Sequence, residues 1–554
     1  MPAIVQVNVS LTTAPLPETL QETGALVSLG GTNTTPGTIS PLTQLADLTP
    51  LLSAPKAISS ITWTADVVTV TTVAAHGLVQ GDTPNLTIAG AVPTGYNGTF
   101  QCTVTGADTF TYPLASNPGA ETTPGTWNSA SVAELTAMAT TFFAQGSGIG
   151  CYALELGTLG TNNAVAALSA YLTANPNTAY TAGALGYFYI YLVPRQFDAN
   201  ANFLTLLQSY QSTTAKTYFW VTTTLATYSV YTALDKCALA LIEAPAYGVW
   251  PANALTAIAW SGGVVTATTT TAHGVAVGQW FQIAGCAPTG YNGWAQAITG
   301  TTGSTLVYAL AANPGVETAL GTLVASTYAS AGIPATEFSI AADFQHVLNY
   351  TPSSSRKVTP NNNAFLFGVT PFPVRGNSAL LTTLFNANIS VVGTGAEGGI
   401  STATMSGGAT LDGNDFQVWY SIDWVQINAD LDIANEIING ANNPSNPLYY
   451  NQPGINRLQA RAAQTVKTGV SYGLVFGGPV QTELSSSDLQ AAIQAGTYAG
   501  SSIVNAESFA TYLAANPNDF QKGEYDGLTL IYTPNIGFRK IVFNVNVNFF
   551  PGQV

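Results

Sequence analysis

Charged side chains are scarce in this chain of 554 residues. Asp, Glu, Lys and Arg make up 7% of the sequence, against roughly 25% in ordinary globular proteins, while apolar residues make up 46%. The rest of the surface must be covered by Thr, Ser, Asn, Ala and Gly, as in the stretches TTVAAHG and NGANNPSNP. Such residues lose little side-chain entropy when another molecule covers them. The composition therefore favours a surface that becomes buried against neighbours.

Positive charge is the scarcer of the two signs. The chain has 13 Lys and Arg against 28 Asp and Glu, which gives a formal net charge of −15. Proteins that bind nucleic acid by counterion release need clusters of several Lys and Arg. The sequence has no such cluster, so we expect no nucleic-acid partner.

An export signal and a membrane span are also missing from the sequence. The first residues, MPAIVQVNVS, contain no basic segment followed by an apolar one, which a secretory signal requires. There is no run of about 18 apolar residues, the length needed to cross a bilayer. We therefore expect a chain that is neither exported by a visible signal nor inserted in a membrane.

Cysteines are few and far apart in the sequence. They show neither the C-x-x-C spacing of metal sites nor the density of a disulfide framework. We expect four free, buried thiols: Cys102, Cys151, Cys237 and Cys286.

A segment of the chain occurs twice. The stretch near residues 57–127 returns near 254–323, and the hexapeptide PTGYNG is identical at 93–98 and 288–293. Both copies are rich in Val, Thr, Phe and Tyr in short alternating runs cut by Gly, Pro and Asn-Gly turns, which predicts a small all-β domain in each. An inserted domain needs closely spaced entry and exit points on an exposed loop, so both β domains are expected on the outside of the core.

The chain between the two copies has a different pattern. Short buried strands such as CYALELG and KTYFWVTTT alternate with helical stretches such as NNAVAALSAYLTANP, which is typical of a parallel α/β sheet. A further helix is expected around residues 454–469. The order along the chain is therefore core, β domain, core, β domain, core.

Both termini have the alternation of a β-strand with one apolar face. A strand this close to a chain end can complete a sheet on another molecule as well as on its own, and an edge strand within the same chain stays the alternative. The apolar positions expected on these intersubunit strand arms are Val5, Val7, Val9, Leu11, Ile541, Phe543, Val545, Val547 and Phe549.

Together these features resemble the tail sheath proteins of contractile bacteriophage tails. The resemblance rests on the two terminal arms, on an α/β core interrupted by β insertions, and on the stretches INRLQARAAQTVKTGVSYGLVFGG and GLTLIYTPNIGFRKIVFNVNVNFF. It implies a structural subunit of the virion, assembled in the host bacterial cytoplasm. In that family, six-subunit rings stack helically around an inner tail tube, the arms add strands to neighbouring subunits, and contraction drives the tube through the host envelope. The partners implied are other copies of the chain, the inner tube, and baseplate and terminator proteins, with no cofactor and no enzymatic activity.

The expected fold is an α/β (α+β) core with a mixed or parallel sheet, interrupted by two homologous all-β domains and flanked by extended strand arms. The boundaries expected are 1–56 for the N-terminal arm and the start of the core, 57–127 for the first β domain, 128–253 for the α/β core, 254–323 for the second β domain, 324–537 for the core continuation and C-terminal sheath domain, and 538–554 for the C-terminal arm.

Three cations lie on the expected helix at 454–469. Arg457 and Arg461 share one face by their i, i+4 spacing, and Lys467 follows. They could contact an acidic inner tube. A solvated or internally paired helix face is the alternative, since a few charges on a helix usually have only that role.

One motif matches a cofactor fingerprint. Residues 393–398 read GTGAEG after the apolar run ISVV and fit the dinucleotide pattern G-x-G-x-x-G. That pattern needs a following helix to present its N–H groups to pyrophosphate, and the next residues, GGISTATMSGGATLDGND, have no helical periodicity. We therefore expect a Gly-rich loop and no bound cofactor.

Other candidate catalytic or metal-binding residues have simpler explanations. His76 and His273 occupy equivalent His-Gly turns of the two copies, where a turn or core hydrogen bond is expected, and His346 has no nearby Cys or His to form a metal site. Two carboxylate pairs, Asp412 with Asp415 and Asp430 with Asp432, are interpreted as turn and cap residues because they lie in stretches rich in Gly and Asn.

Two other classes of protein remain open. A surface-array or adhesin-like protein with glycan-binding β domains would explain the Thr-rich, repeated sequence, although it would normally carry an export signal. An enzyme built on the α/β core would require a pocket of polar groups at the strand carboxyl ends, for which the sequence offers no residues.

Overall fold

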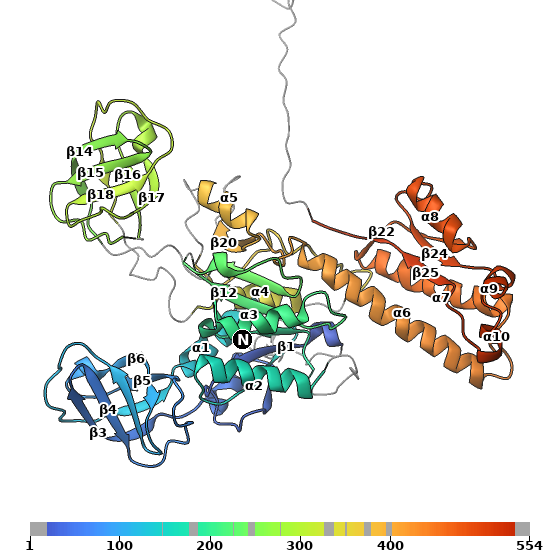
Figure 1. Cartoon of the computed structure of the whole chain (residues 1–554), viewed down its shortest axis with the longest axis horizontal. Coiled ribbons are helices and arrows are strands. Elements are labelled where there is room, and N and C mark those ends of the chain that lie inside the picture. The colour runs from blue at the N-terminus through green and yellow to red at the C-terminus, as the bar shows by residue number, and fades with distance from the viewer. Residues whose placement is uncertain are drawn as a thin grey trace, which may run out of the picture. The chain divides into compact units, whose positions relative to one another are not determined.

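The computed structural model describes residues 19–146, 148–176, 187–224, 226–241, 250–277, 279–325, 337–348, 352–370, 378–394 and 402–537. The chain forms two compact units (Figure 1). Unit 1 comprises Met1–Thr351 and Asn363–Asn414, and unit 2 comprises Pro352–Asn362 and Asp415–Val554.

A six-stranded sheet forms the core of unit 1. The strand order is β13-β12-β11-β1-β10-β2, and all neighbours pair in parallel except the edge strand β2, which runs antiparallel to β10. The strands are β1 (Gly24–Ser28), β2 (Ile39–Leu42), β10 (Cys151–Glu155), β11 (Ile190–Leu192), β12 (Tyr218–Thr223) and β13 (Cys237–Leu241). The parallel α/β sheet expected between the two repeats is therefore confirmed.

Helices cover both faces of this sheet. The apolar side chains of α2 (Thr161–Ala174) and α3 (Ala201–Tyr210) join one core cluster with Ala25, Val27 and Leu154. On the other face, α1 (Ser131–Phe143) packs against β1, and α4 (Ser339–Leu348) packs against α1 and β12. Strands β1, β10, β12 and β13 are buried along their whole length, as expected for a parallel sheet covered on both faces.

Each copy of the repeated segment folds into a small antiparallel β structure. Module 1 consists of β3 (Lys56–Thr64), β4 (Val67–Thr72), β5 (Asn85–Ala89), β6 (Gly98–Gln101), β7 (Thr103–Val104), β8 (Thr109–Pro113) and β9 (Thr126–Ser129). Module 2 consists of β14 (Asn253–Ser261), β15 (Val264–Thr269), β16 (Trp280–Ala284), β17 (Gly293–Gln296), β18 (Thr305–Ala309) and β19 (Thr322–Leu323). Equivalent strands pair in the same way in both modules, since β3 and β14 each lie between a hairpin partner and the last strand of the module.

Polar side chains join module 1 to the core sheet. The Asp82 carboxylate accepts a hydrogen bond from the Gly160 N–H at 2.8 Å, directly before α2 begins, and the Asn85 amide donates to Gln196 Oε1 at 2.8 Å. The Ser129 hydroxyl donates to the Leu29 carbonyl at 2.7 Å, at the end of β1.

Unit 1 is completed by α5 (Ser378–Asn386) and the hairpin of β20 (Val391–Thr394) and β21 (Ala403–Ser406).

Unit 2 is built on a pair of long helices, α6 (Phe416–Asn442) and α7 (Gln452–Ser471). The helix expected at 454–469 is therefore confirmed, with two more residues at each end. A three-stranded sheet, β23 (Pro479–Thr482), β24 (Ser502–Ala506) and β25 (Leu528–Ile531), packs on α7. A two-stranded sheet pairs β22 (Val475–Phe476) with β26 (Thr533–Pro534), and short helices α8 (Ser486–Gln494), α9 (Phe509–Ala515) and α10 (Asp519–Lys522) complete the unit.

Candidate assembly interface

The side chains that first suggested chemistry have structural roles. His76 Nδ1 and His273 Nδ1 each accept a hydrogen bond from the N–H two residues later, at 3.1 Å and 3.0 Å, so both histidines fix equivalent turns. All four cysteines are free and buried, as expected, and burial raises the pKa of the Cys102 thiol to about 12. No group of three or more His, Cys, Asp or Glu side chains in the described part of the chain could hold a metal ion.

A buried carboxylate fills the carboxyl end of the core sheet. Glu155, at the end of β10, is 1% exposed. Its Oε1 accepts hydrogen bonds from the Gly30 and Gly157 N–H groups, both at 2.6 Å, and its Oε2 accepts from Ser28 and Thr32. Open α/β sheets bind ligands at this edge, and backbone N–H groups there often hold a phosphate. Here the chain's own Glu155 carboxylate accepts the hydrogen bonds of the N–H groups at this edge.

The Gly-rich motif at 393–398 lies at the end of a β-hairpin. Gly393 and Thr394 end β20, and the next described element, β21, is its antiparallel partner, whereas the dinucleotide fold requires a helix there. Residues 395–398 lie outside the described part of the chain.

The interpretation of the two carboxylate pairs is right for one pair and wrong for the other. Asp412 accepts hydrogen bonds within a turn, and Asp415 caps α6 by accepting from the Gln417 N–H at 3.0 Å. Asp430 and Asp432, in contrast, lie in the middle of α6. They are helical residues because α6 runs for 27 residues, through a stretch whose Asn content suggested a turn.

The residues that are identical in the two modules hold each module together. Asn97 bridges the Ala91 N–H and carbonyl at 2.8 and 2.9 Å, and Asn292 bridges those of Cys286 at the same two distances. The indoles of Trp63 and Trp260 each donate to a backbone carbonyl at 2.7 Å. These identical residues therefore have the same structural role in both modules.

The three cations of α7 have different surroundings. Arg457 forms an ion pair with Glu436 and also donates to the Asn446 carbonyl at 2.9 Å. Arg461 forms an ion pair with Asp432, and both carboxylates belong to α6. Lys467 is exposed. The arginines therefore connect the two helices, and contact of this face with an inner tube stays a prediction.

The two sheets of unit 2 are small and have exposed edges. Strand β24 is buried throughout, whereas β23 and β25 on either side of it are mostly half-exposed and, in the described residues, pair only with β24. Strands β22 and β26 form a separate sheet of two strands. An isolated two-stranded sheet is marginal by itself, and the unpaired edges of both sheets can accept a further strand. The arm positions Val5, Val7, Val9, Leu11, Ile541, Phe543, Val545, Val547 and Phe549 lie outside the described residues.

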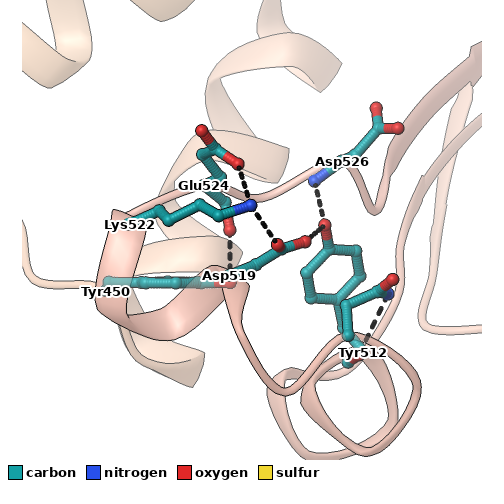
Figure 2. Close-up of polar contacts among 7 residues, drawn as sticks. Tyr450, Tyr512, Asp519, Lys522, Glu524 and Asp526 are labelled. Atoms are coloured by element: carbon teal, nitrogen blue, oxygen red, sulfur yellow. Dashed lines mark hydrogen bonds and ion pairs between the residues drawn. The ribbon is translucent and has the colours of Figure 1, made fainter.

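At the start of α7, unit 2 carries a group of aromatic rings in mutual contact: Tyr450, Phe509, Tyr512, Phe520 and Tyr525. We call this group, with Tyr449 directly before Tyr450 in the sequence, the aromatic end. Figure 2 shows the hydrogen bonds that hold it. The Tyr450 hydroxyl donates to the Glu524 carbonyl at 2.7 Å, and the Tyr512 hydroxyl donates to Asp519 at 3.0 Å and accepts from the Asp526 N–H at 3.0 Å. Burial is the main cause that raises the pKa of Tyr512. The segment from α9 to β25 is thus fixed to the start of α7.

The described helices include none with both the length and the apolar character needed to span a bilayer. No protein-family model matches this sequence, and no curated protein matches it. Among solved structures, the chain is similar to the helical sheath of the anti-feeding prophage in its contracted state. The match covers 99% of this chain and 99% of that chain, with 9% sequence identity and a TM-score of 0.43.

Proposed function

We propose that this chain is the sheath subunit of a contractile tail. It polymerises helically, in six-subunit rings around an inner tail tube, and its contraction drives the tube through a host envelope to deliver the phage genome. The subunit belongs to the virion, and its other partners are the baseplate and the tail terminator.

The observation that carries this proposal is that unit 2 has open sheet edges while both ends of the chain have the sequence pattern of a β-strand. Unit 2 presents two sheets of two and three strands, and both chain ends alternate apolar and polar residues as a strand does. An extended segment that adds to an exposed edge gains a full row of backbone hydrogen bonds. Arms exchanged in this way link subunits while leaving each folded unit intact.

Such linkage suits contraction by rigid-body rearrangement. Subunits that rotate and slide as packed units, while extended arms keep them connected, can change the length of a polymer without unfolding. The energy comes from the difference between two packings, so no nucleotide is needed. The internal filling of the sheet's carboxyl edge by Glu155 agrees with a core that serves as a scaffold.

Electron microscopy of the purified chain tests the proposal. The intact chain is compared by negative stain with one that lacks residues 540–554, and with one in which Ile541, Phe543 and Val545 are replaced by Ser. The matched control replaces Asn544, Asn546 and Asn548 by Ser, on the opposite face of the same expected strand. Hollow striated tubes from the intact chain and the control, lost in the other two, are the expected result. Flat sheets would favour a surface array, and monomers throughout would overturn the sheath function.

A further inference from the structure

The aromatic end of unit 2 is acidic and partly exposed. Tyr449 is 66% exposed and Phe520 is 53% exposed, and the Phe520 ring stacks on Tyr450 with centroids 5.6 Å apart. The Asp519 carboxylate accepts a hydrogen bond from the Tyr512 hydroxyl, and three more carboxylates act electrostatically on the rings of Tyr512 or Tyr525: Glu483, Glu507 and Asp526. Lys522 is the one Lys or Arg with a described ion pair there, at 3.5 Å from Asp519 and 3.4 Å from Glu524. Exposed rings edged by carboxylates are a surface that favours Lys or Arg.

The opposite end of α7 carries cations, which we call the basic end: Arg356 and Lys357. Both residues are exposed. Lys357 lies against Gly473, where a Cβ atom would come within 3.1 Å of the Lys357 Cβ, and the next residue, Val358, donates its N–H to the Tyr472 carbonyl at 3.1 Å. Since the whole chain has 13 Lys and Arg, two adjacent exposed cations stand out.

The last described residue of unit 2, Gly537, lies beside the basic end. Gly537 packs against Pro360, three residues after Lys357.

The two ends of one copy cannot meet. The Phe509 N–H donates to Gln452 at the first turn of α7, so the aromatic end lies at the helix start, whereas Lys357 lies at Gly473, just after the helix end. The 20 residues of α7 span about 30 Å at 1.5 Å per residue. Figure 1 likewise places α9 and α10 at one end of unit 2 and β22 at the other. A lysine side chain is far too short to cross that distance.

We propose that the aromatic end of one copy receives the basic end of a second copy, so that copies associate head to tail through unit 2. This proposal rests on the proposed function in requiring self-association, and it adds a side-chain contact to the exchange of arms. A contact between two different surfaces of the same chain repeats from copy to copy and builds rings or helical filaments. In a surface with so little charge, one complementary pair fixes the order of neighbours.

Carbodiimide cross-linking of the full chain tests the contact directly. The reagent joins an amine to a carboxylate that touches it, so Lys357 should be linked to Glu524 or Asp526. Mixing ¹⁴N-labelled and ¹⁵N-labelled chain before cross-linking shows by mass spectrometry whether each link joins two copies. The link from Lys522 to Asp519 or Glu524, within one copy, is the internal control. Control links without any mixed-isotope link from Lys357 to the aromatic end would overturn the proposal.

Charge reversal separates this proposal from the proposed function. Lys357→Glu and Asp526→Lys are each expected to raise the concentration needed for assembly about tenfold, which corresponds to roughly 1.4 kcal/mol. Mixing the two variants, or combining both changes in one chain, should restore assembly because opposite charges then meet again. Asp430→Lys, an exposed position within α6, is the matched control and should assemble normally.

The outcomes are distinct. If the intact chain forms tubes and both reversals assemble equally well, the head-to-tail contact is wrong and the sheath function stands. If each reversal blocks assembly but their mixture does not restore it, the two ends are not partners. If the intact chain forms no tubes, the sheath function fails, and the cross-links in concentrated solution still decide whether the contact exists.

Discussion

The hydroxyl of Ser28 donates a hydrogen bond of 2.8 Å to the carboxylate of Glu155, joining the ends of the neighbouring strands β1 and β10. Three backbone N–H groups and the Thr32 hydroxyl donate to the same carboxylate. The carboxylate is buried and held by these hydrogen bonds, and no ion pair of Glu155 occurs in the described residues.

Glu155→Gln is expected to destabilise unit 1 by about 3 kcal/mol. Both carboxylate oxygens accept hydrogen bonds from N–H donors, so the amide nitrogen of Gln faces a donor whichever way the amide is turned. A buried donor is then left without an acceptor, and a lost hydrogen bond to a charged group costs about 1.5–3 kcal/mol. Thermal unfolding followed by calorimetry measures the effect. Glu483→Gln, an exposed carboxylate, is the control, and equal melting of the two variants would contradict the prediction.

Asn97→Ala and Asn292→Ala should weaken their own modules by similar amounts, about 2 kcal/mol each, because each removes two hydrogen bonds to a partly buried backbone. Hydrogen exchange measured by mass spectrometry should show faster exchange in residues 85–129 for the first variant and in residues 280–325 for the second. Faster exchange in the other module, or in neither, would show that these side chains do not hold the loops.

Module 2 should lose stability in mild acid. His273 is 1% exposed, and burial lowers its pKa from 6.5. Because the folded pKa lies below the unfolded value, the unfolded state takes up the proton first, so stability is full above about pH 6.5 and falls as the pH drops below it. Hydrogen exchange of residues 253–323, corrected for the intrinsic effect of pH, measures this. His273→Asn should remove the pH dependence, and an unchanged dependence would assign it to another group.

The ion pair between Arg461 and Asp432 should contribute up to about 1 kcal/mol to the packing of α6 on α7, because the two side chains are 40% and 25% exposed and exposed pairs are weak. A double-mutant cycle with Arg461→Ala and Asp432→Asn, measured by denaturant unfolding, isolates this coupling. Binding of the same variants to an inner tube protein is then measured, to distinguish a role of Arg461 in helix packing from a role in tube contact. A loss of tube binding without any coupling would favour the tube contact.

The sequence indicates the core well where the signal is local. CYALELG and KTYFWVTTT are short, mostly apolar stretches between helical patterns, and they form β10 and β12. The helix α7 was visible because Ile455, Ala462 and Val466 recur on one face and are buried. These patterns depend on neighbours within a few residues.

Other elements could not be predicted, because they depend on pairing between distant parts of the chain or have apolar residues that are exposed. Strand β1 is short, and its partners β10 and β11 lie more than 100 residues away in the chain. Its first residue, Gly24, lies where a Cβ atom would come within 2.5 Å of the Phe344 ring. The helix α6 was not predicted at all, and in its second half Leu431 and Ile438 are exposed, at 55% and 59%, so the apolar residues there do not follow a buried face. The aromatic end was missed because its rings come from separate stretches between Tyr449 and Tyr525.

The strand pairing at the base of each module has a practical consequence. Lys56 pairs with Trp127, and Asn253 pairs with Leu323, so each module leaves the chain and returns to it at adjacent backbone positions. A foreign domain whose own termini lie side by side could therefore be spliced in place of either module without stretching the scaffold. In the polymer that we propose, every such position repeats along the length, so one splice would present the foreign domain as a dense, regularly spaced display.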